Sequence, residues 1–170
     1  KKGLSYYEAQ FEHCNSTLVM DSTAAMIRYP RRVRELYEQH GSTNSVKFIF
    51  TIRDPGRREV SLYQYMAREC INGTNVKSKF CRSGQPLPLE QYIANIVSQF
   101  EYNQLDRVYG LYARYLKVWF EIWDRKQILL VSHEEMETNP IDFADRIHKF
   151  LAISGQPQEF PPVHDYALEE

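Results

Sequence analysis

The chain has 170 residues, which suits one domain with a single hydrophobic core. A hydrophobic fraction of 43% and an aromatic fraction of 14% are typical of a globular protein and exclude a disordered chain. The formal net charge of −1 gives no global field that would favour nucleic acid or an anionic membrane, so any anion site has to be local.

No run of 18 apolar residues occurs, and no signal peptide is recognisable. The chain starts at Lys1 without a Met, which we interpret as the interior of a longer protein. The absence of a targeting signal therefore carries little information.

The first part of the chain predicts two buried strands separated by a helix. Pro30 suits the start of that helix and Gly41 its end. The second strand is rich in β-branched and aromatic residues and nearly continuous in apolarity, which favours a central strand covered on both faces. The predicted elements are the strand Thr17–Met20, the helix Pro30–His40 and the strand Val46–Ile52.

The next helix begins directly after the second strand, because Asp54 can cap it and Pro55 suits the first helical position. Residues Ile71–Pro88 form a long polar loop, of a kind that often acts as a lid or a substrate edge. The remaining predicted elements are a helix to about Cys70, helices Leu89–Phe100 and Val108–Asp124, the strand Gln127–Val131 and the helix Ile141–Leu151.

Two residue patterns have both a structural and a functional reading. The helix Val108–Asp124 carries an apolar stripe at spacings of three and four, which indicates core packing more simply than an aromatic substrate platform. A cluster of arginines near the first helix indicates a solvated helix face more simply than an anion site. The stripe is Tyr112, Tyr115, Leu116, Trp119 and Trp123, and the cluster is Arg28, Arg31, Arg32 and Arg34.

Strands that alternate with helices predict an α/β fold with a parallel sheet and helices on both faces. Ligands of such sheets bind at the carboxyl ends of the strands. The residues that lie just past a predicted strand, and so at the candidate site, are Asp21, Ser22, Arg53 and His133.

The stretch from Arg53 to Ser61 has the residues of a phosphate site. The planar guanidinium of Arg53 matches a phosphate group, and the Ser61 hydroxyl, eight residues on, adds a donor. Backbone N–H groups at the helix start favour an anion as well, and Arg57 and Arg58 raise the local positive charge. The alternative is that Arg53 pairs with Asp54 or with a carboxylate of the helix.

This stretch resembles the 3′-phosphate-binding motif of sulfotransferases that use 3′-phosphoadenosine 5′-phosphosulfate (PAPS), a strand followed by Arg-Asp-Pro-x-x-Arg-x-x-Ser. The matching residues are Arg53, Asp54, Pro55, Arg58 and Ser61. The resemblance implies that Arg53, Arg58 and Ser61 bind the cofactor, and that Arg53 and Ser61 hold its 3′-phosphate.

Three further segments are similar to the same family. Met20–Met26, followed by Tyr29-Pro30, resembles a segment reading D/E-x-S/T-P-x-Y, and the helix beginning Gly110-Leu111-Tyr112 resembles the one that closes on the adenosine side. The stretch from Ile128 to Ile153 resembles the strand, turn and terminal helix of carbohydrate sulfotransferases, with Glu134 at the position of the turn's glutamate. The resemblance extends from Lys2 to Ile153 and is closest to Golgi-type enzymes acting on glycans, including the heparan sulfate group. It implies a three-layer, P-loop-like sulfotransferase fold, of which this chain would form a part.

The resemblance also shows departures. The N-terminal loop that grips the 5′-phosphosulfate does not occur here, so residues 1–170 are interpreted as one sulfotransferase-like domain truncated at the N-terminus, with truncation at the C-terminus left open. Lys2–Glu8 matches a segment like K-E-x-H-F-F-D, but Gly3 and Ser5 replace its glutamate base and its histidine. Glu8 is the candidate base and Lys2 a candidate for binding an acidic sugar, against the alternatives of a surface glutamate and a frayed terminus. Ser22 and Ala24 also replace a Lys and a Pro that are frequent after the first strand of the family. No metal is expected, because the histidines lack the spacing of metal ligands.

The cysteines and two sequons bear on the compartment. Cys70 and Cys81 flank the polar loop and can bridge across it, which leaves Cys14 free or paired elsewhere. Sequons occur at Asn15 and Asn72. Together these features favour the Golgi lumen or the secretory pathway, with membrane attachment only through an N-terminal anchor outside this sequence.

Three functions remain open at this point. The first is sulfuryl transfer from PAPS to a hydroxyl or amine of a glycan or small-molecule acceptor, without nucleic acid as a partner. The second is a catalytically degenerate module that keeps only nucleotide binding. The third is another P-loop-type nucleotide-binding protein, which the lack of a GxxxxGK[ST] sequence disfavours.

Overall fold

The structure is a computed structural model of the chain, and it describes residues 20–22, 24–39, 41, 43–73, 80–101 and 110–155. The chain folds as two compact units. One unit comprises Lys1–Phe48 and Arg114–Ile128, and the other comprises Ile49–Ala113 and Leu129–Glu170.

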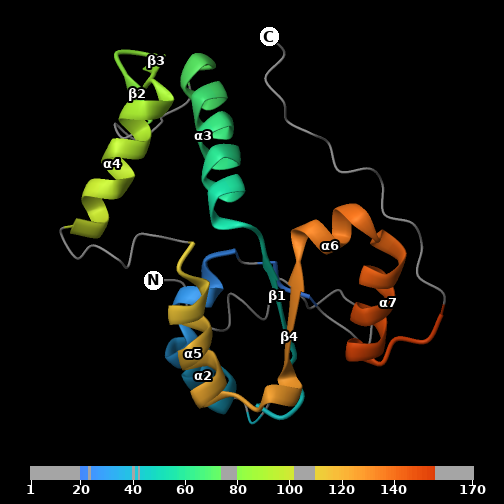
Figure 1. The fold of residues 1–170 in the computed structure, drawn as a ribbon. Helices are drawn as coiled ribbons and strands as arrows, with labels where there is room; N and C mark the ends of the chain where they lie inside the picture. Colours follow the sequence, from blue (N-terminus) through green and yellow to red (C-terminus); the bar gives the residue numbers. More distant parts are fainter. Residues whose placement is uncertain are drawn as a thin grey trace. The chain divides into compact units, whose positions relative to one another are not determined.

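The first unit is helical and has an aromatic core. Trp119 is fully buried, and the Phe48 ring packs against Trp119 and Trp123 with centroid separations of 4.7 and 4.6 Å. The predicted core stripe is therefore confirmed at Leu116, Trp119 and Trp123, which are all buried. The helices of this unit are η1 (Ala24–Arg28), α2 (Pro30–Gln39), α5 (Tyr112–Ile122) and η3 (Arg125–Gln127) (Figure 1).

Two strands pair although they are far apart in the sequence. β1 (Phe48–Ile52) and β4 (Ile128–Ser132) form one sheet and run in the same direction (Figure 1). The Gln127 side chain donates to the carbonyl oxygens of Thr43 and Val46 at 2.6 and 2.9 Å, which fixes the turn before β1 beside the start of β4. Both predicted strands are confirmed, and the predicted strand Thr17–Met20 lies outside the described residues except for Met20.

Helix α3 (Pro55–Ile71) follows β1 after two residues. Asp54 accepts a hydrogen bond from the Arg57 backbone N–H through Oδ1 at 2.8 Å, and Pro55 occupies the first turn. Both features are those that the sequence predicted. A side-chain cap of this kind contributes about 1 kcal/mol, so the chain direction after the strand is locally encoded.

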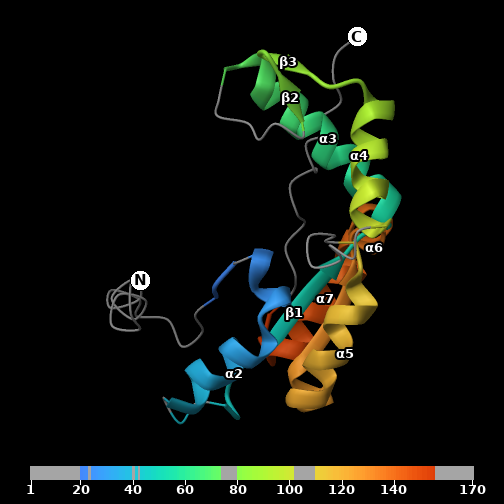
Figure 2. The same ribbon diagram turned by 90° about the vertical axis from the view of Figure 1, so that its left-hand side faces the viewer.

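A small hairpin packs on α3, and α4 (Leu89–Glu101) lies alongside α3 (Figures 1 and 2). Its strands β2 (Cys81–Arg82) and β3 (Gln85–Pro86) are antiparallel. Ser83 and Gly84 have φ angles of 52° and 77°, as a two-residue turn of type I′ requires. The prediction of a polar loop up to Pro88 was wrong here, because the Ser-Gly turn signal was overlooked.

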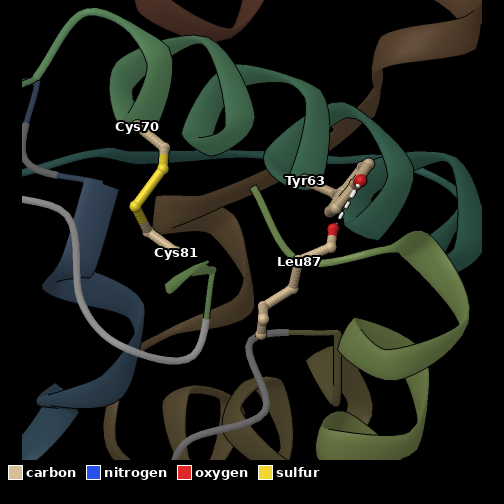
Figure 3. Close-up of a disulfide and its surroundings, with 4 residues drawn as sticks. All are labelled: Tyr63, Cys70, Cys81 and Leu87. Carbon is tan, nitrogen blue, oxygen red and sulfur yellow. Dashed lines mark hydrogen bonds between the residues drawn. A yellow bond between two sulfur atoms is a disulfide. The ribbon is translucent and has the colours of Figure 1, made fainter. Parts of the chain in front are cut away.

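The hairpin is fixed to α3 by covalent and packing contacts. A disulfide joins Cys70 on α3 to Cys81 on β2, and the Tyr63 hydroxyl donates to the Leu87 carbonyl oxygen at 2.8 Å (Figure 3). The ring of Tyr92, almost fully buried, stacks on that of Phe80 with centroids 5.1 Å apart. The sequence left the Cys70–Cys81 pairing open, and the structure forms it.

The last part of the chain contains one helix that the sequence analysis missed. α6 (His133–Thr138) begins directly after β4, and Ser132 caps it by accepting from the Glu135 backbone N–H at 2.9 Å. The pattern Ser-x-x-Glu is a capping-box signal that was not used. α7 (Pro140–Leu151) follows and confirms the predicted terminal helix, with Phe143 buried.

Two predicted helix boundaries also need correction. The helix expected from Val108 starts at Tyr112, because Gly110 and Leu111 are not helical in the described part of the chain. Its end moves from Asp124 to Ile122, because Asp124 accepts from the Lys126 backbone N–H and caps η3 instead. None of the described helices is long and apolar enough to cross a membrane.

We expect the disulfide to stabilise the unit that contains the hairpin. Closing a sequence separation of 11 residues should contribute about 2–4 kcal/mol to the free energy of unfolding. Urea unfolding of the wild type with and without dithiothreitol measures this difference. The variant C70S/C81S should be less stable and insensitive to dithiothreitol, and equal stability of the variant and the oxidised wild type would contradict the role.

Candidate functional site

The candidate site lies where β1 ends and α3 begins. Arg53 occupies the link between them and is half-buried. Its Nε is buried and has no hydrogen-bond partner among the described residues, and no ion pair is recorded there for its guanidinium. The alternative in which Arg53 pairs with Asp54 or a carboxylate of α3 is therefore not what the structure forms. An unsatisfied buried donor on a charged group costs upwards of about 1–3 kcal/mol. An acceptor beside Nε of Arg53 would remove this cost.

Asp54 is held from two sides. Its side chain caps α3, and its backbone N–H donates to Oε1 of Glu134 at 2.9 Å. This hydrogen bond is the main reason that the pKa of Glu134 lies below its usual value, and the nearby side chains of His133 and Arg57 act in the same direction. Glu134 therefore ties the start of α3 to the first turn of α6 as a carboxylate.

Arg58 is part of a polar chain that leads away from the strand end. Its guanidinium pairs with Glu59, and the second oxygen of Glu59 accepts from the Tyr92 hydroxyl at 2.8 Å. Burial, followed by this bond to a carboxylate, raises the pKa of Tyr92. The hydroxyl therefore stays protonated and links α4 to the second turn of α3.

Ser61 and Gly110 complete the surroundings of the first turns of α3. Ser61 lies on α3 eight residues after Arg53 and is half-buried. A methyl group added at Gly110 would lie 3.2 Å from Cβ of Pro55, which is closer than most such contacts. The absence of a side chain at Gly110 thus allows the backbone before α5 to approach the first residue of α3.

The other predicted site residues are distributed unevenly. Lys2 and Glu8 lie outside the described residues, so their predicted roles stay predictions. Asp21 and Ser22 are exposed and belong to the first unit. His133 is the first residue of α6, and its Nδ1 lies 3.2 Å from a carboxylate oxygen of Glu137 on the same helix.

The structure adds two residues that were not among the predicted site residues. Glu134 was recognised only as a match to a family glutamate, and its contact with Asp54 depends on the pairing of β4 with β1. Gly110 was recognised only as the start of a helix, and its approach to Pro55 has no signal in the sequence beyond the glycine itself. Both lie beside the helix start rather than in the phosphate motif.

Comparison with known proteins agrees with this geometry. Residues 12–168 match the family described as sulfotransferase domain, so the chain belongs to that family. The crystal structure of a sulfotransferase from Alicyclobacillus acidocaldarius is similar, with a TM-score of 0.69 and 18% sequence identity. The similarity covers 99% of this chain and 62% of that one, so the chain spans less than two thirds of that sulfotransferase. No curated protein matches the sequence.

These findings confirm the predicted α/β class, a parallel sheet flanked by helices, and the sulfotransferase family. The narrower assignment to Golgi enzymes acting on glycans stays a prediction. So do the single domain over residues 1–170 and the roles of Arg53, Arg58 and Ser61 in cofactor binding.

We expect the bond between Glu134 and Asp54 to depend on pH. Because the folded-state pKa of Glu134 is lowered from 4.5, its contribution to stability is fully present above that value and is lost as the pH falls through the lowered pKa. Urea unfolding of the wild type and E134Q should differ most at pH 7 and converge in acid. A stability difference that stays constant from pH 7 to acid would contradict an ionised Glu134.

Proposed function

We propose that the protein is a sulfotransferase in which this chain holds the 3′-phosphate of PAPS and passes a sulfuryl group to a hydroxyl or amine of a carbohydrate acceptor. The observation that carries the proposal is the half-buried Arg53, whose buried Nε has no hydrogen-bond partner among the described residues, at the carboxyl end of a strand in a sulfotransferase-type fold. Ligands of parallel sheets bind at that end of the strands.

The residues present fit a phosphate dianion. Arg53 would donate from its guanidinium, whose Nε lacks an acceptor among the described residues. The helix α3 starts two residues later, and the positive end of its dipole favours an anion at the same place. Ser61 would add a hydroxyl donor from the second turn of α3. Arg58 is already paired with Glu59, so it would contribute positive charge near the site and not a free donor pair.

The positioning of Arg53 depends on its neighbours. Asp54 is fixed by its cap to Arg57 and by its bond to Glu134, so the backbone that carries the guanidinium is held at both α3 and α6. Preorganised donors of this kind are more effective than flexible ones, because no reorganisation is needed when charge develops. PAPS would supply the sulfuryl group and leave as 3′,5′-adenosine diphosphate, and transfer also needs a base for the acceptor proton, for which Glu8 is the candidate.

We also propose that the protein works in the Golgi lumen or elsewhere in the secretory pathway. The disulfide between Cys70 and Cys81 supports an oxidising compartment. Asn72, the first residue of a sequon, caps the end of α3 and is exposed, so a glycan at that position has access to solvent.

The donor site is tested by titrating 3′,5′-adenosine diphosphate calorimetrically. We expect R53A to weaken binding by about 1.5–3 kcal/mol, roughly tenfold to more than a hundredfold in Kd, because a charge-assisted bond to phosphate is lost. S61A should weaken binding less, by about 0.5–1.5 kcal/mol, because its hydroxyl is neutral.

K126A serves as the control, because Lys126 is an exposed cation on η3 in the other unit. It should bind as the wild type does. Equal affinity of R53A and the wild type would refute the role of Arg53. Binding with no sulfuryl transfer to any acceptor by the complete protein would instead favour a degenerate nucleotide-binding module.

The compartment is tested in cells that express the complete protein. We expect peptide N-glycosidase to increase its electrophoretic mobility, and N72Q to remove part of that shift, because Asn72 is exposed in a sequon. Free thiols at Cys70 and Cys81 together with an unchanged mobility would contradict the secretory pathway.

A further inference from the structure

Two neighbouring arginines at the start of α3 have different surroundings. Arg57 is exposed, and no hydrogen bond or ion pair is recorded for its side chain in the described part of the chain. Arg58 pairs with Glu59, and each of these two side chains is only 25% exposed. The sequence motif selects Arg58 as a cofactor-binding cation, whereas Arg57 is the more accessible of the two.

The partner of Arg58 is itself anchored from α4. The second carboxylate oxygen of Glu59 accepts from the Tyr92 hydroxyl at 2.8 Å. The Tyr92 ring is 1% exposed and packs against the rings of Phe80 and Tyr63, with centroid separations of 5.1 and 5.4 Å. An ion pair whose carboxylate is held in this way is costly for a second anion to displace. Arg58 is therefore committed to joining α3 to α4.

The helical period places Arg57 on the face of α3 that carries Ser61. Residues four apart on a helix are neighbours on its surface. A second row with the same spacing, Pro55, Glu59 and Tyr63, contacts other segments of the same unit. The two rows start two residues apart, which is a rotation of about 200° around the helix axis. Arg57 and Ser61 therefore lie on the side of α3 that these contacts do not use.

Arg57 is also connected to the residues that fix Arg53. Its backbone N–H donates to Oδ1 of Asp54 at 2.8 Å, and its positive charge acts on the carboxylate of Glu134. That carboxylate accepts from the Asp54 backbone N–H at 2.9 Å. Arg53 and Arg57 therefore flank the same two carboxylates.

The charges at the strand end favour a second cation. Arg53 brings one positive charge, while Asp54 and Glu134 bring two negative ones, which leaves an excess of one negative charge. The pair of arginine and glutamate that faces α4 adds no net charge. A phosphate dianion would therefore meet repulsion from these carboxylates. Arg57 cancels the excess and adds a second planar group of donors that matches a phosphate.

We propose that Arg57 is the second cation of the phosphate site and that it binds the 3′-phosphate of the nucleotide together with Arg53 and Ser61. This inference rests on the proposed function, because it requires a phosphate group beside Arg53. It departs from the family motif, whose second arginine stands one residue later, at Arg58.

The test is a calorimetric titration of the protein with two nucleotides. 3′,5′-Adenosine diphosphate carries the 3′-phosphate, and adenosine 5′-monophosphate lacks it. We expect R57A to weaken binding of the diphosphate about tenfold, the lower end for a bond between charged groups, because the Arg57 side chain is exposed. Binding of the monophosphate should not change. R57K should recover part of the loss, because it restores the charge but not the planar group of donors.

Two further variants separate a direct contact from other effects. R58A is the matched control, because it removes the same charge from the next residue of the helix, and it should weaken binding of the diphosphate less than R57A does. The second is R57A in the E134Q background, where the substitution should still weaken binding about tenfold if Arg57 does not act through Glu134. The melting temperature of R57A should equal that of the wild type, because the side chain is exposed.

The variant R53A distinguishes failure of this inference from failure of the proposed function. If R53A weakens binding, any one of four results overturns the role of Arg57 alone. These are unchanged affinity in R57A, a larger loss in R58A than in R57A, no effect of R57A in the E134Q background, and an equal loss for the two nucleotides. If R53A binds the diphosphate as the wild type does, the proposed function fails and the role of Arg57 fails with it.

Discussion

The rest of the candidate site depends on two hydrogen bonds at Asp54. Its carboxylate caps α3 through the Arg57 N–H, and its own N–H is bound by Glu134. Together they fix the residue at which β1 turns into α3, directly after Arg53. Glu134 lies on α6, which follows β4, so the pairing of β4 with β1 is needed to bring Glu134 to Asp54. The position of Arg53 therefore depends on the paired strands and not on the motif alone.

Helix α3 connects this point to the disulfide-bonded hairpin. Arg58 pairs with Glu59, Glu59 accepts from Tyr92, and Tyr92 stacks on Phe80 next to Cys81. Every contact in this series is made within one unit of the structure. The bond from Tyr92 to Glu59 therefore joins α4 to the second turn of α3, which also carries Ser61.

Positive charge is distributed in two different ways in the protein. At the end of β1 the half-buried Arg53 has a buried Nε without an acceptor in the described part of the chain, as suits one compact anion. In the helical unit four arginines, Arg28, Arg31, Arg32 and Arg114, line a groove together with Glu35 and the exposed Tyr29. The formal net charge of −1 gives no sign of either arrangement.

The sequence by itself determined the elements whose signals are local. Asp54 and Pro55 encode the start of α3, the apolar run before them encodes β1, and the aromatic stripe of α5 encodes a core, because caps, periodicity and propensity act over a few residues. The phosphate motif itself was recognisable for the same reason.

Only the tertiary structure decided which distant residues meet. The contact of Glu134 with Asp54 spans 80 residues, and the approach of Gly110 to Pro55 depends on packing between elements. The groove of ≈430 Å³ lined by Arg28, Arg31, Arg32 and Arg114 could not be read from the sequence, because η1 and α2 meet α5 only after folding. The sequence specified the ionic groups, and the packing of helices and the pairing of strands determined whether each one found a partner within the chain.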